Sequence, residues 1–137
     1  MKNSRPKHQY TIMFLTMILS GLLSTMSAWV DKIDDIRFSI NDIYMNLLMS
    51  GWMFVITGLF YNQMDIFFIG VPMVVITIWC IRTQFLVTET QYKLGMIQHH
   101  SIAVHMSKKL LEKENTITPL LEKIIKNQQD ELEILKM

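Results

Sequence analysis

Residues 10–30 read YTIMFLTMILSGLLSTMSAWV and contain no charged side chain. At a rise of about 1.5 Å per residue, a helix of this length crosses the roughly 30 Å hydrocarbon core of a membrane. Lys2, Arg5 and Lys7 precede the stretch, with no acidic residue among them. The stretch is long for a signal peptide, and residues 27–30 make a poor cleavage site, so we expect a retained transmembrane span.

Two further apolar stretches predict a membrane region that is entirely α-helical. The second span is expected at about residues 43–61 and the third at about 66–81, with a helical continuation to about Val87 left open. The tight turn between these two spans predicts an antiparallel hairpin, and residues 31–42 form a short polar loop before it. The expected organisation has three parts: a basic flank at 1–9, a three-span region at 10–87 and a helical-hairpin Met/His domain at 88–137.

Small, polar and sulfur-bearing residues recur at helical spacing in each span. In the second span they are Asn46, Ser50, Met53 and Thr57. Lipid gives helices no hydrophobic reason to associate, so such stripes usually mark the faces where helices touch. Met45, Met49 and Met53 also form a ladder four residues apart. Packing and the passage of a soft metal both remain open for this ladder.

After the spans, the tail has the pattern of two helices. The first is expected from about Thr88 to Glu114 and the second from Pro119 to about Lys136, with Thr118 as its N-cap. The apolar face of the second helix consists of Leu121, Ile124, Ile125, Leu132 and Leu135, with Gln128 in its middle and Glu131 at its edge. A buried glutamine needs a hydrogen-bond partner, which imidazoles on the first helix can supply.

Residues 96–106 read MIQHHSIAVHM and hold the chemistry of the tail. On a helix, His99 and His100 flank the face of Met96, Met106 lies beside His99, and His105 points the opposite way. A thioether beside imidazoles suits copper, above all Cu(I). The alternative is that the methionines fill a core and the histidines cap carbonyls. The candidate metal ligands are Met96, His99, His100 and Met106, with Gln128 and Glu131 as further contributors from the second helix.

These motifs resemble the family called domain of unknown function 305. The resemblance lies in M-I-x-H-H-x-x-A-x-x-M at residues 96–106 and I-I-x-x-Q-x-x-E at 124–131. Residues 26–31, 44–53 and 81–84 are similar to small three-span membrane members of the same family. The resemblance implies a ferritin-like helical-bundle fold, half of which the two-helix tail would supply, and some members are periplasmic copper-binding proteins.

Several positions depart from the family pattern. Glu89, Tyr92 and Gly95 stand where the family usually has aspartate, phenylalanine and serine, and His105 commonly corresponds to an acid. Leu135 stands where the family often has a methionine. Without a methionine at this position, any metal site that uses ligands from the second helix is weaker.

Charge and cysteine content exclude several function classes. The net charge is +1 without a basic stripe, so we expect no nucleic-acid partner, and the single cysteine, Cys80, allows no intrachain disulfide. The chain contains no Glu-x-x-His pair, serine–histidine–aspartate arrangement or phosphate loop, and we expect no catalytic residues and no enzyme.

We therefore expect an integral membrane protein whose tail binds copper for metal handling or tolerance. Basic residues before the first span place the N-terminus in the cytoplasm, and three spans place the tail outside it, in the periplasm if the source is bacterial. Two helices bury only one seam, so we expect a homo-oligomer, most simply a dimer, embedded in the lipid bilayer. The alternative is a structural membrane protein whose tail mediates oligomerisation without metal.

Overall fold

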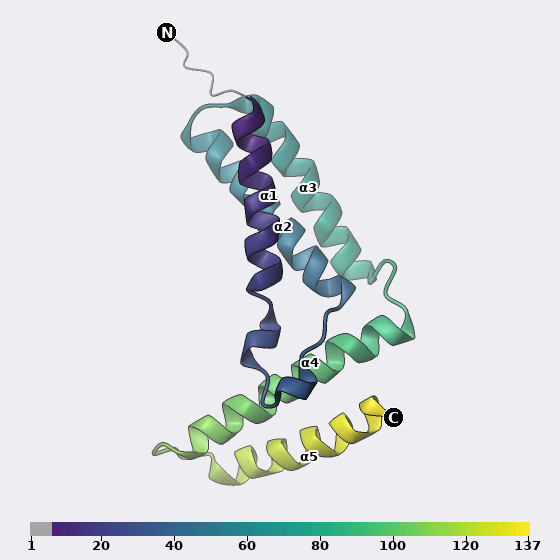
Figure 1. Ribbon diagram of the computed structural model, residues 1–137. Coiled ribbons are helices and arrows are strands. Elements are labelled where there is room, and N and C mark those ends of the chain that lie inside the picture. Colours follow the sequence, from purple (N-terminus) through teal and green to yellow (C-terminus); the bar gives the residue numbers. More distant parts are fainter. Residues whose placement is uncertain (1–6) are drawn as a thin grey trace. The chain divides into compact units, whose positions relative to one another are not determined.

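A computed structural model describes residues 7–137, and the described part is helical, without strands. The elements are α1 (Lys7–Leu23), η1 (Met26–Trp29), η2 (Ile33–Asp35), α2 (Ile40–Phe60), α3 (Met64–Thr83), α4 (Glu89–Leu111) and α5 (Thr118–Lys136) (Figure 1). Three segments, His8–Trp29, Ile40–Phe60 and Met64–Thr83, are long and apolar enough to cross a membrane. The all-helical prediction is confirmed. Most of the expected basic flank lies outside the described residues.

The described chain forms two compact units. The first combines residues up to Ser24 with Asn41–Phe85, and the second combines Thr25–Ile40 with Leu86–Met137. The second unit therefore joins the loop that follows α1 to the tail that follows α3. The expected boundaries had placed this loop with the membrane region.

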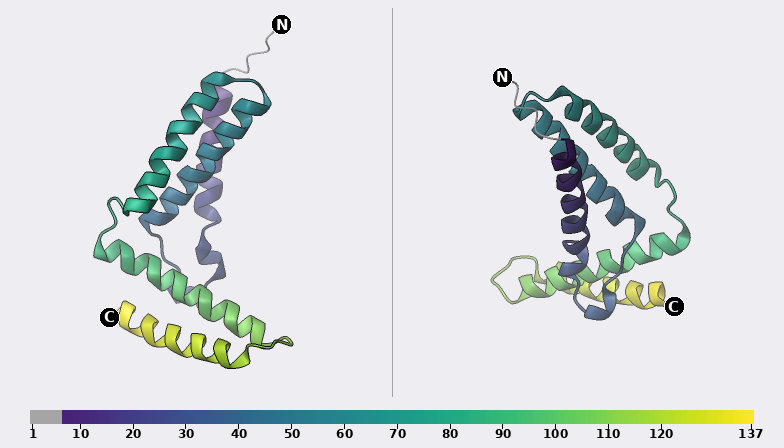
Figure 2. Two further views of the ribbon diagram at one scale, coloured as in Figure 1. Left: turned by 180° about the vertical axis from the view of Figure 1, so that it is seen from behind. Right: turned by 45° about the horizontal axis from the view of Figure 1, so that its top comes forward.

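Within the first unit, glycines let α2 and α3 approach closely. A Cβ at Gly70 would lie 2.7 Å from the backbone nitrogen of Val55 and 2.9 Å from the carbonyl oxygen of Gly51. At Gly58 a Cβ would lie 2.7 Å from the nitrogen of Phe67. The absent side chains permit this contact, as expected for helices that associate in lipid. In both orientations of Figure 2 the two helices form the predicted antiparallel hairpin.

Contacts of α2 also agree with the predicted small-residue stripe. Asn46 and Ser50 are both buried, and the Ser50 hydroxyl donates to the carbonyl of Asn46 at 2.9 Å. The Asn46 side chain packs against Gly21 of α1, where a Cβ would overlap its amide oxygen. The stripe therefore faces neighbouring helices, as its composition indicates.

The first apolar stretch does not form one continuous helix. α1 ends at Leu23, and Thr25 has extended backbone (φ −68°, ψ 162°) before the short turn η1. The Ser27 hydroxyl then donates to the carbonyl of Arg37 at 2.8 Å, which ties η1 to the loop. Serine and threonine compete with helix by such local and loop hydrogen bonds, so apolar character alone overestimates the length of this helix.

The third helix ends before the residue to which it could have continued. α3 stops at Thr83, and Gln84 adopts the left-handed conformation (φ 50°) while its N–H bonds to the carbonyls of Cys80 and Ile81. Leu86 also has positive φ, at 58°. The helix therefore continues past Ile81 to Thr83, but it does not reach Val87.

In the second unit, α4 and α5 pack as an antiparallel hairpin (Figure 1). Ile97, Val104 and Leu132 form its buried core, with Ile125 and Leu135 packed against them. This confirms the apolar face predicted for the second tail helix. α4 begins after Thr88, whose hydroxyl accepts from the backbone N–H of Gln91.

The turn between α4 and α5 is capped differently from the prediction. Asn115 Oδ1 accepts from the Ile117 N–H at 3.2 Å and from the Thr118 hydroxyl at 3.0 Å. Thr118 is already the first helical residue, and its hydroxyl acts as a donor. Thr118 is therefore not the N-cap. Asn115 closes the turn because its amide oxygen reaches both donors.

Candidate functional site

The proposed metal ligands of α4 differ in their exposure. His100 is buried at 8% exposure, Met96 is half-buried, and His99 is exposed. Met106 is 53% exposed. Met96 precedes the histidine pair by three and four residues, so its side chain lies one turn before the two imidazoles, which flank it on either side. These three side chains are the compact part of the predicted set.

His100 is the histidine that contacts α5. Its Nδ1 lies 2.9 Å from Oε2 of Glu131, although the contact lacks the alignment of a hydrogen bond. The pair is ionic only when the imidazole is protonated. Glu131 is 52% exposed on its side chain, so its carboxylate remains in contact with solvent. The sequence had left open whether Glu131 is only a solvated residue, and the structure brings it to His100.

Gln128 and Met106 lie in other surroundings. Gln128 is half-buried, and its side chain forms no hydrogen bond with another residue in the described range 7–137. Met106 lines a groove of about 540 Å³ with Trp29, Leu110 and Leu121, among other residues. Neither His99 nor His100 lines that groove. Met106 is therefore separated from the compact part of the set.

Imidazole, thiol and carboxylate groups do not cluster in threes at metal-binding distance anywhere in the described chain. The predicted set contains two imidazoles and two thioethers on α4, with one amide and one carboxylate from α5. Glu131 contacts one of these imidazoles only.

A second cluster, which the sequence did not reveal, joins the loop to the opposite side of α4. Asp35, in η2, is buried at 1% exposure, and its Oδ2 accepts from the hydroxyl of the fully buried Ser101 at 2.7 Å. Its Oδ1 pairs with the ammonium of Lys136 in α5. Burial alone would raise the pKa of the Asp35 carboxyl, but hydrogen bonds from Lys136 and Ser101 and the positive charges of Lys136 and Lys32 lower it below its ordinary value of 3.8.

Asp31 makes the neighbouring contacts of this cluster. Its carboxylate lies 2.6 Å from the ammonium of Lys108, and its backbone N–H donates to Ser101 Oγ at 2.9 Å. His105 Nδ1 lies 4.0 Å from the same carboxylate. The face opposite the proposed metal ligands, to which His105 was assigned, is thus the face that holds the loop.

Two glutamines of α4 extend this loop-binding face. Gln98 Nε2 donates to the Ser27 hydroxyl at 2.9 Å, and Gln91 Oε1 accepts from the Ile40 N–H at 2.9 Å. Polar residues therefore recur along one face of α4, and this pattern is the signal that could have found the contact. The members of this face are Gln91, Gln98, Ser101, His105 and Lys108.

A polar hollow of about 280 Å³ lies beside the cluster. Its lining carries acids from both the loop and α5, together with two lysines. The lining residues include Asp31, Lys32, Asp35, Asp130, Glu133 and Lys136. The two loop acids already have lysine partners, so the cluster is suited to holding the loop and the hairpin together.

Comparisons with known proteins found one match to the tail and one to most of the chain. Residues 83–137, which contain α4 and α5, match the family described as Domain of unknown function (DUF305). The chain is also 40% identical over 128 residues to "Uncharacterized protein L153" of Acanthamoeba polyphaga mimivirus, an alignment that covers 88% of this chain and 84% of the viral protein. No solved structure matches the chain.

Proposed function

Because the chain belongs to the family of the mimivirus L153 protein and carries a DUF305 domain at residues 83–137, we propose that it is an integral membrane protein whose tail binds copper. The favoured ion is Cu(I), and the role is metal handling or tolerance. The observation that carries this proposal is the grouping of Met96, His99 and His100 within little more than one turn of α4.

One thioether and two imidazoles form a soft ligand set of the kind that Cu(I) accepts. His100 contacts Glu131 through Nδ1, which leaves Nε2 for an ion. A carboxylate that contacts the second nitrogen of a ligating imidazole fixes the ring and raises its basicity. We assign this orienting role to Glu131.

Met106 completes the set only through a second copy of the chain. It follows Met96 by ten residues, which separates the two by about 15 Å along a helix, too far for both to bind one ion. A second hairpin would bring another Met106 and would turn the two-helix tail into a four-helix, ferritin-like bundle. The functional form is therefore a dimer.

The chain path also supports a single location for the loop and the tail. Thr25–Ile40 and Leu86–Met137 belong to one compact unit, so both lie on the same side of a membrane that α1, α2 and α3 cross. Basic residues at the N-terminus favour the cytoplasm for that end. The metal-binding unit then faces away from the cytoplasm.

A Cu(I) titration against a competing chelator tests this function with the full chain in detergent. Replacing His99 and His100 together with glutamine should weaken binding at least a hundredfold, because second and third ligands are lost at once. The matched control is His105→Gln on the loop-binding face, which should change affinity less than threefold. Equal losses in the two proteins, or equal retention of Zn²⁺ and Cu(I), would contradict the proposal.

The alternative function is oligomerisation without metal. An exposed apolar stripe on α4 favours it, since Tyr92 is 53%, Met106 53% and Leu110 37% exposed. Sedimentation of the detergent-solubilised chain, corrected for bound detergent, separates the two functions. A dimer that needs copper and both histidines supports metal binding, and a dimer that persists in the double-histidine variant without copper supports the alternative. A monomer that binds one copper ion would refute the dimeric site.

A further inference from the structure

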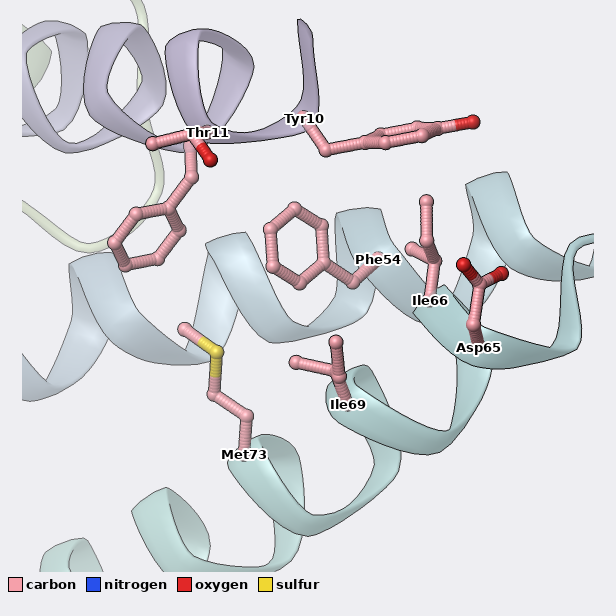
Figure 3. Close-up of a pocket in the computed structure, with 8 residues that line it drawn as sticks. Tyr10, Thr11, Phe54, Asp65, Ile66, Ile69 and Met73 are labelled. Carbon is pink, nitrogen blue, oxygen red and sulfur yellow. The ribbon is translucent and has the colours of Figure 1, made fainter. Parts of the chain in front are cut away.

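A hollow within the first unit is independent of the proposed metal site. It has a volume of about 530 Å³ and lies between side chains of α1, α2 and α3 (Figure 3). Its lining residues are Tyr10, Thr11, Phe14, Phe54, Asp65, Ile66, Ile69 and Met73. A volume of this size accommodates a small ligand or part of a lipid.

Most of the wall is apolar and aromatic. Phe14 of α1 and Phe54 of α2 lie with ring centroids 5.7 Å apart, and Ile66, Ile69 and Met73 of α3 complete the surface. Figure 3 shows the Phe54 ring and the Met73 thioether pointing into the same space. Such a wall accepts a hydrocarbon chain and gives it no hydrogen bonds.

One end of the hollow is polar and carries negative charge. Asp65 lies in the first turn of α3, where the helix dipole interacts favourably with an acidic side chain. It is exposed and makes no ion pair with the side chains that the structure describes. The Tyr10 hydroxyl oxygen is buried and likewise has no hydrogen-bond partner among them. In Figure 3 this hydroxyl extends toward the side on which the Asp65 carboxylate lies.

From this arrangement we propose that the hollow binds an amphiphile with a primary ammonium head and a hydrocarbon chain. The ammonium pairs with Asp65 and donates to the Tyr10 oxygen, and the chain lies along Phe54 and Met73. A primary ammonium has three donors, so it serves both groups at once. Aromatic rings nearby also attract a cation. A fatty acid would meet the Asp65 carboxylate with like charge.

Two sources share this chemistry, an ethanolamine-headed lipid of the bilayer and a free long-chain amine. Helix-dipole stabilisation explains an acid at the start of α3 without any ligand. It does not account for the buried, unpartnered hydroxyl of Tyr10 at the same end of the hollow.

The experiment follows the methyl resonance of Met73 in the full chain, labelled with ¹³C-methyl methionine in detergent. The resonance is assigned with Met73→Leu, and dodecylamine is titrated against dodecanol, which has the same chain without the charge. Dodecylamine should bind the wild type roughly fivefold or more tightly than dodecanol. Asp65→Asn should remove that preference, whereas the exposed control Asp34→Asn should keep it.

The ratio of dodecylamine affinity to dodecanol affinity in the wild type already decides the proposal. The test therefore does not depend on whether Asp65→Asn folds normally. Equal affinities, or no shift of the Met73 resonance with either ligand, overturn it. Tyr10→Phe removes the hydroxyl alone and should lower the affinity for dodecylamine, because the ammonium loses one of its two partners. An unchanged amine preference in Asp65→Asn together with an unchanged dodecylamine affinity in Tyr10→Phe also overturns the proposal.

Nanodiscs identify the source of the ammonium. In phosphatidylcholine alone, dodecylamine should shift the Met73 resonance. If phosphatidylethanolamine alone shifts the Met73 resonance and prevents the further shift by dodecylamine, the ligand is a lipid. Phosphatidylethanolamine without effect identifies a free amine.

Discussion

Replacing Asp35 with asparagine tests whether the buried carboxylate holds the loop to the tail. Asparagine keeps the shape and an acceptor for the Ser101 hydroxyl but removes the charge that pairs with Lys136. The change therefore isolates the ionic part of the interaction. Asp34→Asn, one residue earlier in the same turn and exposed, is the matched control.

The magnitude follows from the burial of the three partners. Weakening a charge-assisted hydrogen bond from Ser101 to a neutral one costs about 1 kcal/mol. Breaking a fully buried ion pair costs about 3–5 kcal/mol, but the Lys136 side chain is 33% exposed and can rehydrate, so we reduce this contribution to about 1–2 kcal/mol. The expected loss of local stability is about 2–3 kcal/mol.

Amide hydrogen exchange measured by mass spectrometry on the full chain in detergent reports this loss. Peptides from α5 should exchange about 30- to 150-fold faster in Asp35→Asn, and peptides from α2 and α3 should be unchanged. Asp34→Asn should stay within about twofold of the wild type. If exchange in Asp35→Asn also stays within twofold of the wild type, the ion pair does not stabilise this unit.

Acid provides a second measurement on the same pair. The pKa of Asp35 is lowered in the folded state, so its stabilisation is complete above the ordinary value of 3.8 and is lost as pH falls through the folded-state pKa. The wild type protects the amides of α5 from exchange more than Asp35→Asn does. This difference should therefore be constant from pH 7 to 5 and should narrow below pH 3.8. If the difference in exchange protection already narrows between pH 7 and 5, a group other than Asp35 is responsible for it.

Gly70→Leu should separate α2 from α3 and destabilise the first unit by about 1–3 kcal/mol or more, because its Cβ meets backbone atoms that cannot move alone. Thermal unfolding in detergent measures this, and Val75→Leu, at a position 61% exposed, should have little effect. In a cysteine-free background made with Cys80→Ser, an impermeant thiol reagent should label Asn127→Cys but not Ser4→Cys in intact cells. Labelling of the Ser4 variant alone would reverse the proposed topology. Copper affinity should decrease in acid, because protons compete for the imidazole nitrogens.

The helices were largely predictable from the sequence because their signals are local. Charge-free stretches predicted the three apolar segments, and the periodicity of Leu121, Ile125 and Leu132 predicted the buried face of α5. The boundary errors come from hydrogen bonds that hydropathy does not describe. Ser27 draws the end of the first stretch into the loop, and Gln84 ends α3 in the left-handed conformation.

The polar face of α4 was visible in the sequence, but its partners in the loop could not be predicted because these contacts join distant segments. Asp35 and Ser101 are 66 residues apart, and Asp31 and Lys108 are 77 residues apart. The residues 31–42 had the composition of an ordinary polar loop. The sequence correctly placed His105 on the face of α4 away from the proposed metal ligands, and Glu131 at the edge of the α5 face. The burial of His100 beside an exposed His99 depends on α5, which helical spacing alone does not position.

The distance along the chain between Asp35 and Lys136 has a consequence for synthesis. The two residues are 101 positions apart, and ribosomes add about 5–20 residues per second. Roughly 5–20 seconds therefore pass between the synthesis of the acidic loop and that of Lys136, the lysine that pairs with Asp35. During that interval two hydrophobic helices are made, and the loop must stay soluble with its carboxylates hydrated. Its acidic character suits that delay, since charged segments avoid premature association while the rest of their folding unit is still being translated.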